Sequence, residues 1–152
     1  MSDWKLPQEG GCLCGGVRFR VSAPPLFTSV CHCKGCQRMT GSAYSLSAAV
    51  PSAAFEVIAG DPVIGALHGE HRHFYCSHCM SWLFTRPDGA DFLVNVRATM
   101  LDEPDSFAVP FMETGTRDKL PWVTTPATHS FHMFPEMEDF PKLLEAFAQQ
   151  TA

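Results

Sequence analysis

Seven cysteines, gathered in three short clusters, constrain the fold of this chain more than any other feature. The clusters are Cys12-Leu13-Cys14, Cys31-His32-Cys33-Lys34-Gly35-Cys36 and Cys76-Ser77-His78-Cys79. Cysteines one or two residues apart cannot easily bridge to each other, because neighbouring side chains diverge or close a very small ring. They can converge on one metal ion, and thiolates at this spacing are typical of Zn²⁺ sites. We therefore expect the chain to bind zinc.

The remaining composition is that of an ordinary globular protein. The 152 residues, 45% of them apolar and 18% charged, predict a single domain over residues 1–152. A formal net charge of −5 argues against nucleic-acid binding, and no apolar run approaches the roughly 18 residues of a membrane span. An odd number of cysteines fits disulfide pairing poorly, and residues 1–7 lack the apolar run of a secretory signal. We expect a reducing, cytoplasmic setting.

Apolar residues alternate with polar ones in several segments, which predicts a mainly β fold. The clearest is 17–21, where Val17, Phe19 and Val21 share one face. The glycine-rich segment 10–16 before it is predicted to be a tight turn. Further strands are predicted at residues 44–50, 55–58, 63–67, 71–75, 82–85 and 92–96, the last as a central strand.

The end of the chain predicts a helix. Its buried face would consist of Phe140, Leu143, Leu144 and Phe147. Asp139 is the expected N-cap, and Pro141 falls in the first turn, where proline is tolerated. One more helical turn is predicted at residues 37–41, after the middle cluster.

The seven thiolates can be divided between two metal ions in two ways. In the division that the spacing favours, Cys31, Cys33 and Cys36 bind one zinc from a single loop. The other four, which would close a structural site, are Cys12, Cys14, Cys76 and Cys79. In the rival division the closed site consists of Cys31, Cys33, Cys76 and Cys79, and Cys12 and Cys14 join a histidine. The spacing does not exclude the rival.

A zinc ion with three thiolates keeps an open position, which can bind and activate a small molecule. Such a centre is electron-rich and favours soft ligands such as an incoming thiol. A thiolate held there could add to an aldehyde carbon, and the reverse step would break the same carbon–sulfur bond. The alternative is a second structural site, completed by His32, His78 or another side chain.

Other polar residues carry weaker signals. Lys34 and Arg38 lie beside the open site and could attract substrate carboxylates, and Trp122 could wall a pocket. The histidine pairs 71/73 and 129/132 could bind metal, but surface histidines are the commoner interpretation. The other basic side chains that could meet an anionic substrate, although such a set is more often solvated surface, are Arg18, Arg20, Arg97, Arg117 and Lys119.

Three motifs resemble those of the glutathione-dependent formaldehyde-activating family, which also includes centromere protein V. They are Gly10-Gly11-Cys12-Leu13-Cys14-Gly15-Gly16-Val17-Arg18-Phe19, Cys31-His32-Cys33-Lys34-Gly35-Cys36-Gln37-Arg38 and Phe74-Tyr75-Cys76-Ser77-His78-Cys79. Later segments at 102–105 and 120–122 are similar too, so the resemblance covers residues 10–122.

The resemblance implies a β-tent fold of small antiparallel sheets and two zinc ions per chain. It implies a structural zinc on Cys12, Cys14, Cys76 and Cys79, and a second, catalytic zinc on Cys31, Cys33 and Cys36. Glutathione and formaldehyde would combine beside the second zinc to give S-hydroxymethylglutathione, the reaction of a carbon–sulfur lyase.

The chain departs from the family pattern at two places. Met80 follows Cys79 where the family usually has glycine, which puts the local turn in question. Residues 110–116 lack the aromatic-rich segment often found before the Pro-Trp pair. Because that region is expected to shape the pocket, the resemblance does not identify the substrate.

The leading hypothesis is therefore a zinc enzyme that acts on the carbon–sulfur bond of a small thiol adduct. One alternative is a zinc-stabilised binding or carrier module without turnover. Another is a reservoir of labile zinc or reactive thiols. A second zinc that survives dialysis and binds added thiol favours the first two hypotheses over the third.

Overall fold

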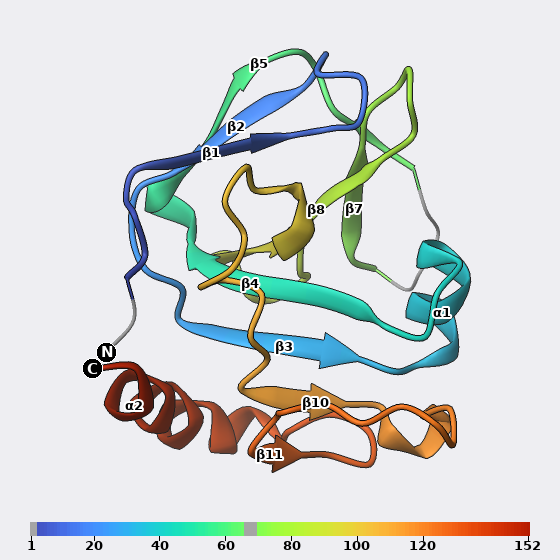
Figure 1. Ribbon diagram of the computed structural model, residues 1–152, viewed down its shortest axis with the longest axis vertical. Coiled ribbons are helices and arrows are strands. Elements are labelled where there is room, and N and C mark those ends of the chain that lie inside the picture. Colours follow the sequence, from blue (N-terminus) through green and yellow to red (C-terminus); the bar gives the residue numbers. More distant parts are fainter. Residues whose placement is uncertain (1–2, 66–69) are drawn as a thin grey trace.

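The computed structural model describes residues 3–65 and 70–152 and shows a mainly β protein with a C-terminal helix (Figure 1). The smaller sheet has the strand order β1-β2-β5, and the larger has the order β11-β10-β3-β4-β9-β8-β7-β6. Within the described residues, no helix has the length and apolar character that a bilayer crossing requires. The expectation of a mainly β chain ending in a helix is confirmed.

The small sheet contains β1 (Gln8–Gly11), β2 (Arg18–Val21) and β5 (Phe55–Ala59). The predicted strand at 17–21 corresponds to β2, in which Phe19 and Val21 are fully buried. The turn predicted at 10–16 is shorter, because Gly10 and Gly11 belong to β1. Glycine is needed at position 10, since an added Cβ would lie 2.3 Å from the Met100 carbonyl oxygen.

The large sheet contains β3 (Phe27–Cys31), β4 (Ser45–Pro51), β6 (Val63–Ile64), β7 (Arg72–Tyr75), β8 (Trp82–Arg86), β9 (Leu93–Arg97), β10 (Met112–Thr114) and β11 (His129–Ser130). Four predicted strands match β4, β7, β8 and β9, and β9 is central as expected, between β4 and β8. The strand predicted at 63–67 is reduced to β6, and residues 66–67 lie outside the described residues.

Three strands of the large sheet have no counterpart among the predictions: β3, β10 and β11. β3 pairs antiparallel with β4, whereas β10 runs parallel to both β3 and β11. The large sheet is therefore mixed rather than purely antiparallel. β3 matters most, because it ends at Cys31 and carries the chain into the middle cysteine cluster.

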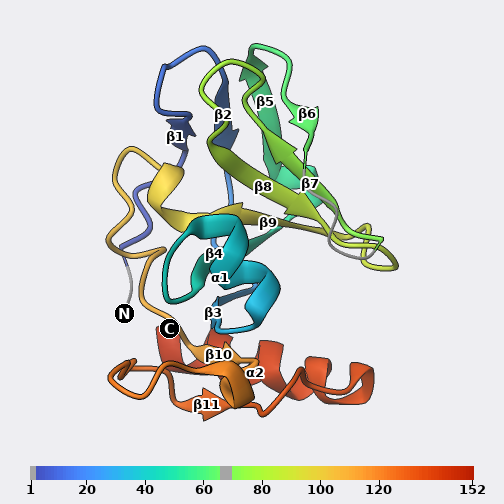
Figure 2. The same ribbon diagram turned by 90° about the vertical axis from the view of Figure 1, so that its right-hand side faces the viewer.

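Two hydrophobic cores hold these layers together. Figures 1 and 2 show the small sheet at one end of the molecule and α2 (Phe140–Thr151), β10 and β11 at the other, with β3 and β4 between them. The first core lies between the sheets and includes Phe19, Phe55 and Phe84. The second lies under α2 and includes Phe27, Phe111, Met112, Leu143 and Phe147.

The predicted C-terminal helix is confirmed as α2. Leu143 and Phe147 are buried, and the Phe147 ring packs edge-on against Phe111 with the centroids 5.4 Å apart. Asp139 is the N-cap residue as predicted, although its side chain makes no capping hydrogen bond to α2. It accepts instead from the Glu136 backbone N–H at 3.3 Å and caps the short 3₁₀ turn that precedes the helix.

We predict that Phe147→Ala lowers the free energy of unfolding by about 3–5 kcal/mol, because it removes a buried ring and leaves a cavity. Chemical denaturation measures this change. The exposed Gln149→Ala on the same helix is the control and should stay within about 0.5 kcal/mol of the parent protein. A loss below 1 kcal/mol for Phe147→Ala, which is roughly the cost of a surface change, would mean that α2 does not seal the second core.

Candidate metal centres and the adjoining cavity

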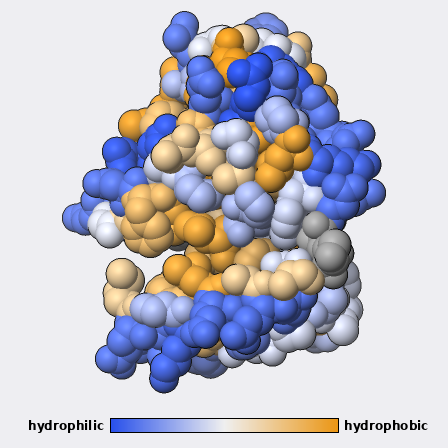
Figure 3. All heavy atoms as spheres, turned by 90° about the vertical axis from the view of Figure 1, so that its left-hand side faces the viewer, coloured by the Kyte–Doolittle hydropathy of each residue, from blue (hydrophilic) through white to orange (hydrophobic). Residues whose placement is uncertain are grey.

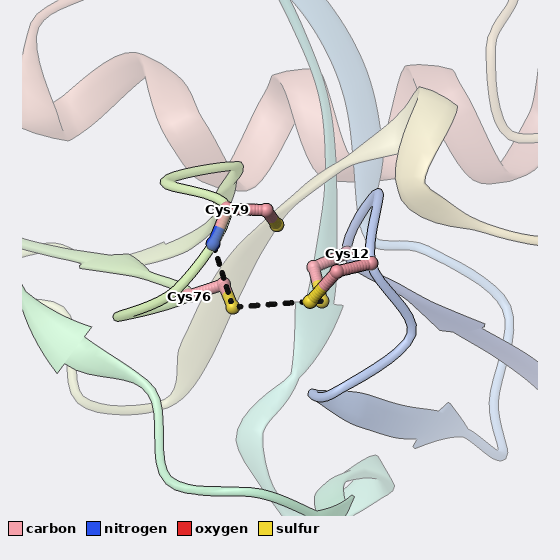
Figure 4. A group of neighbouring side chains, drawn as sticks. Cys12, Cys76 and Cys79 are labelled. Carbon is pink, nitrogen blue, oxygen red and sulfur yellow. Dashed lines mark hydrogen bonds between the residues drawn. The ribbon is translucent and has the colours of Figure 1, made fainter.

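Four cysteines from two distant turns converge at one point. Cys12 and Cys14 lie in the turn between β1 and β2, and Cys76 and Cys79 lie in the turn between β7 and β8. The four sulfurs all lie within 4.8 Å of one another. Figure 4 shows the labelled side chains of Cys12, Cys76 and Cys79 turned toward a common centre. This grouping is the one that the spacing favoured, and four thiols so close together are a donor set of the kind that binds zinc.

Backbone N–H groups surround these sulfurs. Val17 donates to Cys12 Sγ at 3.2 Å, Gly16 donates to Cys14 Sγ at 3.4 Å, and His78 donates to Cys76 Sγ at 3.4 Å. Such bonds favour the thiolate over the thiol, because the charged sulfur is the stronger acceptor. The Gly16 N–H lowers the pKa of Cys14, but the neighbouring thiols outweigh it and raise that pKa to about 11, so a cation among the four sulfurs is what would let all of them ionise together.

Ser81 connects the two turns through hydrogen bonds. Its hydroxyl lies 3.2 Å from Cys79 Sγ and accepts a hydrogen bond from the Leu13 backbone N–H at 3.1 Å. The Ser81 hydrogen bond lowers the pKa of the Cys79 thiol to about 5. Met80 has a φ of 60°, a left-handed conformation in which glycine would be unstrained. The turn after Cys79 thus keeps a backbone conformation typical of glycine, although residue 80 is methionine.

The other three cysteines form a second group at the start of α1 (Lys34–Thr40). Cys31 ends β3, Cys33 is the N-cap of the helix, and Cys36 lies in its first turn; their sulfurs also lie within 4.8 Å of one another. The helical turn predicted at 37–41 is thus part of a longer helix, and Cys33 Sγ accepts from the Cys36 N–H at 3.3 Å. Among the described residues, no histidine or carboxylate completes the group.

The chemistry of the three thiols fits a bound cation. The neighbouring thiols of Cys31 and Cys33 raise the pKa of Cys36, because adjacent negative charges repel each other. Burial adds to this effect. The three sulfurs can therefore ionise together when a positive charge lies among them, and Zn²⁺ supplies such a charge.

His32 does not join either group, although it lies between two cysteines of the second. Its ring is fully buried, and its Nε2 lies 3.5 Å from Glu113 Oε1 on β10. Glu113 also accepts from Lys119 Nζ at 2.7 Å and from the Thr125 hydroxyl. Burial raises the pKa of Glu113, but these hydrogen bonds and the positive charge of Lys119 outweigh it and leave the pKa below its usual value. The cluster holds the loop of the second group against β10.

A cavity of about 520 Å³ opens beside the three-cysteine group, and Cys31, Cys33 and Cys36 form part of its wall. Apolar side chains from the sheet and from the segment before α2 form most of the rest. They include Phe27, Phe92, Leu93, Met112, Phe134 and Phe140. Figure 3 shows the molecule hollowed between its upper part and the layer below, with hydrophobic residues gathered along the hollow. The second group thus faces a space in which a small molecule can bind.

The predicted substrate contacts Lys34, Arg38 and Trp122 are not among the residues that line this cavity, and Trp122 is 75% exposed. Their roles stay predictions. The surface interpretation of His73 is wrong, because this side chain is only 4% exposed and lines the cavity. Arg97, one of the basic side chains that the sequence offered for an anionic substrate, also lines this cavity, whereas the set as a whole was expected to be solvated.

The chain is similar to known proteins in both sequence and fold. A family model described as glutathione-dependent formaldehyde-activating enzyme matches residues 7–117, a range that holds all seven cysteines. A crystal structure of a Rhodobacter sphaeroides protein has a TM-score of 0.52 and 19% sequence identity, and the match covers 62% of this chain and 87% of that one. At this identity the likeness shows the fold alone. No curated protein matches the chain.

We predict that Cys76→Ser removes one zinc ion per chain and lowers the free energy of unfolding by about 4 kcal/mol or more, a loss typical of a disrupted metal site. Elemental analysis and chemical denaturation measure the two effects. The adjacent, exposed Ser77→Ala is the matched control and should change neither. Full zinc content in Cys76→Ser would contradict the four-cysteine assignment.

Glu113→Gln should lower the free energy of unfolding by about 1–3 kcal/mol, because a neutral amide removes the buried negative charge that pairs with Lys119 and weakens the hydrogen bond between them. Glu145→Gln, on the exposed face of α2, is the control. The folded pKa of Glu113 is depressed, so the difference is full above its unfolded pKa of about 4.3. It disappears as the pH falls through the folded pKa. Thermal melting of both variants between neutral pH and acid tests this, and an equal difference at all pH values would refute it.

Proposed function

The chain belongs to the glutathione-dependent formaldehyde-activating enzyme family, and we propose that it is a zinc-dependent carbon–sulfur lyase acting on a small thiol–aldehyde adduct. The family's own description, which names glutathione and formaldehyde, supports S-hydroxymethylglutathione as the type of product. The observation that carries the proposal is the three-cysteine group in the wall of a cavity. That group offers one ligand fewer than the four-cysteine group, so a fourth position is left for a substrate atom.

The two proposed metal sites have different roles. Cys12, Cys14, Cys76 and Cys79 would hold a structural zinc that joins the two turns. Cys31, Cys33 and Cys36 would hold a second zinc that, when bound, acts as a Lewis acid toward a thiol sulfur or an aldehyde oxygen. The cavity beside the second group would hold the two reactants close together and keep bulk water away from them.

The reaction is an addition without a change in redox state. The thiol gives up its proton, a sulfur lone pair forms the new bond to the aldehyde carbon, and the carbonyl π electrons move to oxygen. The oxygen takes up one proton, so a thiol and an aldehyde give a hydroxyalkyl thioether. The reverse sequence breaks the carbon–sulfur bond. The end of β3 positions Cys31, and the N-cap of α1 positions Cys33. The contact between His32 and Glu113 holds the loop that contains these cysteines against β10.

We further propose that residues 1–152 act as one catalytic domain in a reducing compartment such as the cytoplasm. Seven thiols in two tight groups would oxidise in an extracellular setting unless metal protected them. The expected partners are a small thiol such as glutathione and a small aldehyde. Nucleic acid and membrane are not expected partners of this acidic chain.

We predict that the protein accelerates exchange between formaldehyde and glutathione, and that Cys33→Ser reduces this acceleration at least about tenfold, because it removes one of three ligands of the catalytic centre. Exchange spectroscopy by NMR measures both rates against buffer. Gln149→Ala, remote from both metal groups, is the control and should keep the parent rate.

Two results would oppose this proposal in different ways. If neither protein exceeds the buffer rate, the activity is absent, and a binding module without turnover becomes the better account. If Cys33→Ser and the parent protein accelerate exchange equally, the activity does not depend on the three-cysteine group.

A further inference from the structure

Arg97 is a buried cation without a carboxylate partner. It ends β9, its side chain is 7% exposed, and it forms part of the cavity wall that also contains the three cysteines. Its Nη2 donates to Thr85 Oγ1 at 3.2 Å and to the Asn95 carbonyl oxygen at 3.4 Å. Its Nε has no hydrogen-bond partner. Within residues 3–65 and 70–152, no acidic side chain forms an ion pair with it.

Such a charge is costly to bury, and the neighbouring side chains offset the cost only in part. The guanidinium carbon lies 3.9 Å from the centroid of the Trp82 ring, a cation–π contact. Burial lowers the pKa of Arg97 to about 10, while the nearby thiols of Cys36 and Cys31 oppose this effect. A guanidinium with this pKa is still charged at neutral pH, so the cavity wall contains a positive charge that no carboxylate of the described residues pairs with.

The surrounding contacts hold the guanidinium in a fixed position. The Thr85 hydroxyl that accepts from Arg97 also lies 2.7 Å from His73 Nδ1. The His73 ring in turn packs edge-on against Trp82, with the centroids 5.2 Å apart. Because β7, β8 and β9 each contribute one or more of these side chains, the arrangement is built into the sheet. A fixed cation binds an anion with less loss of entropy than a mobile surface lysine does.

Most of the cavity wall apart from these groups is apolar. Met112 and Phe27 from the sheet and Phe140 from α2 are among the residues that line it. A ligand that fills this space must therefore present an apolar stem to the walls, an anionic group to Arg97 and, at the thiol centre, a reactive sulfur or carbonyl. An ion pair formed here gains strength, because the low-dielectric surroundings screen it poorly.

We propose that Arg97 determines the substrate specificity of this cavity by pairing with a carboxylate of the substrate. The substrate class is then a small thiol, or its aldehyde adduct, that carries a carboxylate on a short apolar stem. The thiol part of this proposal rests on the proposed function, whereas the preference for an anion does not. The sequence offered Arg97, Lys34 and Arg38 alike for an anionic substrate, and of these three Arg97 lines the cavity.

The test compares matched ligands with the zinc-loaded protein. The thiol pair is 3-mercaptopropionate and neutral 3-mercapto-1-propanol, and the thiol-free pair is butanoate and 1-butanol. Trp82 lies directly under the guanidinium, so its fluorescence reports binding when Trp4 and Trp122 are replaced by phenylalanine. The variants are Arg97→Met, Arg97→Lys and, as a control for an exposed cation outside the cavity wall, Lys142→Met. Zinc content is measured for each.

We expect the parent protein to favour each anion over its neutral partner by at least about tenfold, as a charge-assisted hydrogen bond would give. Arg97→Met should lose this preference and still bind the neutral thiol, Arg97→Lys should keep part of it, and Lys142→Met should keep all of it. Equal binding of anion and alcohol by the parent protein would overturn the proposal. An anion preference that persists in Arg97→Met would also overturn it, whether or not that variant keeps the second zinc. Arg97 would then act only as a positive charge that stabilises the cysteine thiolates.

The two ligand pairs separate this proposal from the proposed function. If thiols bind no better than their thiol-free partners while the anion preference holds, Arg97 is an anion-binding residue and the thiol site fails. If thiols bind well without any preference for the anion, the thiol site stands and the role of Arg97 fails.

Discussion

The convergence of four thiols from two distant turns is the contact on which the rest of this structure depends. Cys12 and Cys14 lie in the turn between two strands of the small sheet, and Cys76 and Cys79 lie in the turn between two strands of the large one. Apolar contacts between two sheets are not directional, whereas four ligands on one ion would fix the relative position of the two turns. Because β7, β8 and β9 are positioned through this joint, it also sets the wall of the cavity that contains Arg97.

Local patterns predicted the parts of the fold that are half-buried. Phe19 and Val21 alternate with arginines and gave β2, and the apolar stripe with Leu143 and Phe147 gave α2. The pattern failed where a strand is short or buried throughout. Met112 to Thr114 are all buried and pair in parallel with β3, a long-range contact that leaves no periodic signal in three residues. β3 was missed for a related reason, because its small polar residues do not alternate regularly with apolar ones.

The sequence predicted the part of the candidate site that is formed by residues close together in the chain. The spacing of Cys31, Cys33 and Cys36 brings three sulfurs together through a strand end and a helix cap, and both features are local. The part of the cavity wall that contains Arg97 is formed by residues that lie far apart in the sequence. Arg97 is buried because β9 pairs with β8 in a register that sets Thr85 opposite Asn95, and no feature of the segment 92–96 reveals this register. Trp122, the residue predicted to wall a pocket, is instead largely exposed.

The account requires two metal ions with unequal numbers of sulfur ligands in one small domain. The most direct test is X-ray absorption at the zinc edge on protein purified without chelators, combined with elemental analysis of the same sample. We predict two zinc ions per chain and a mean coordination between three and four sulfurs, with the remainder supplied by a lighter atom. A single zinc bound by four sulfurs, or two zinc ions both bound by sulfur alone, would contradict the account.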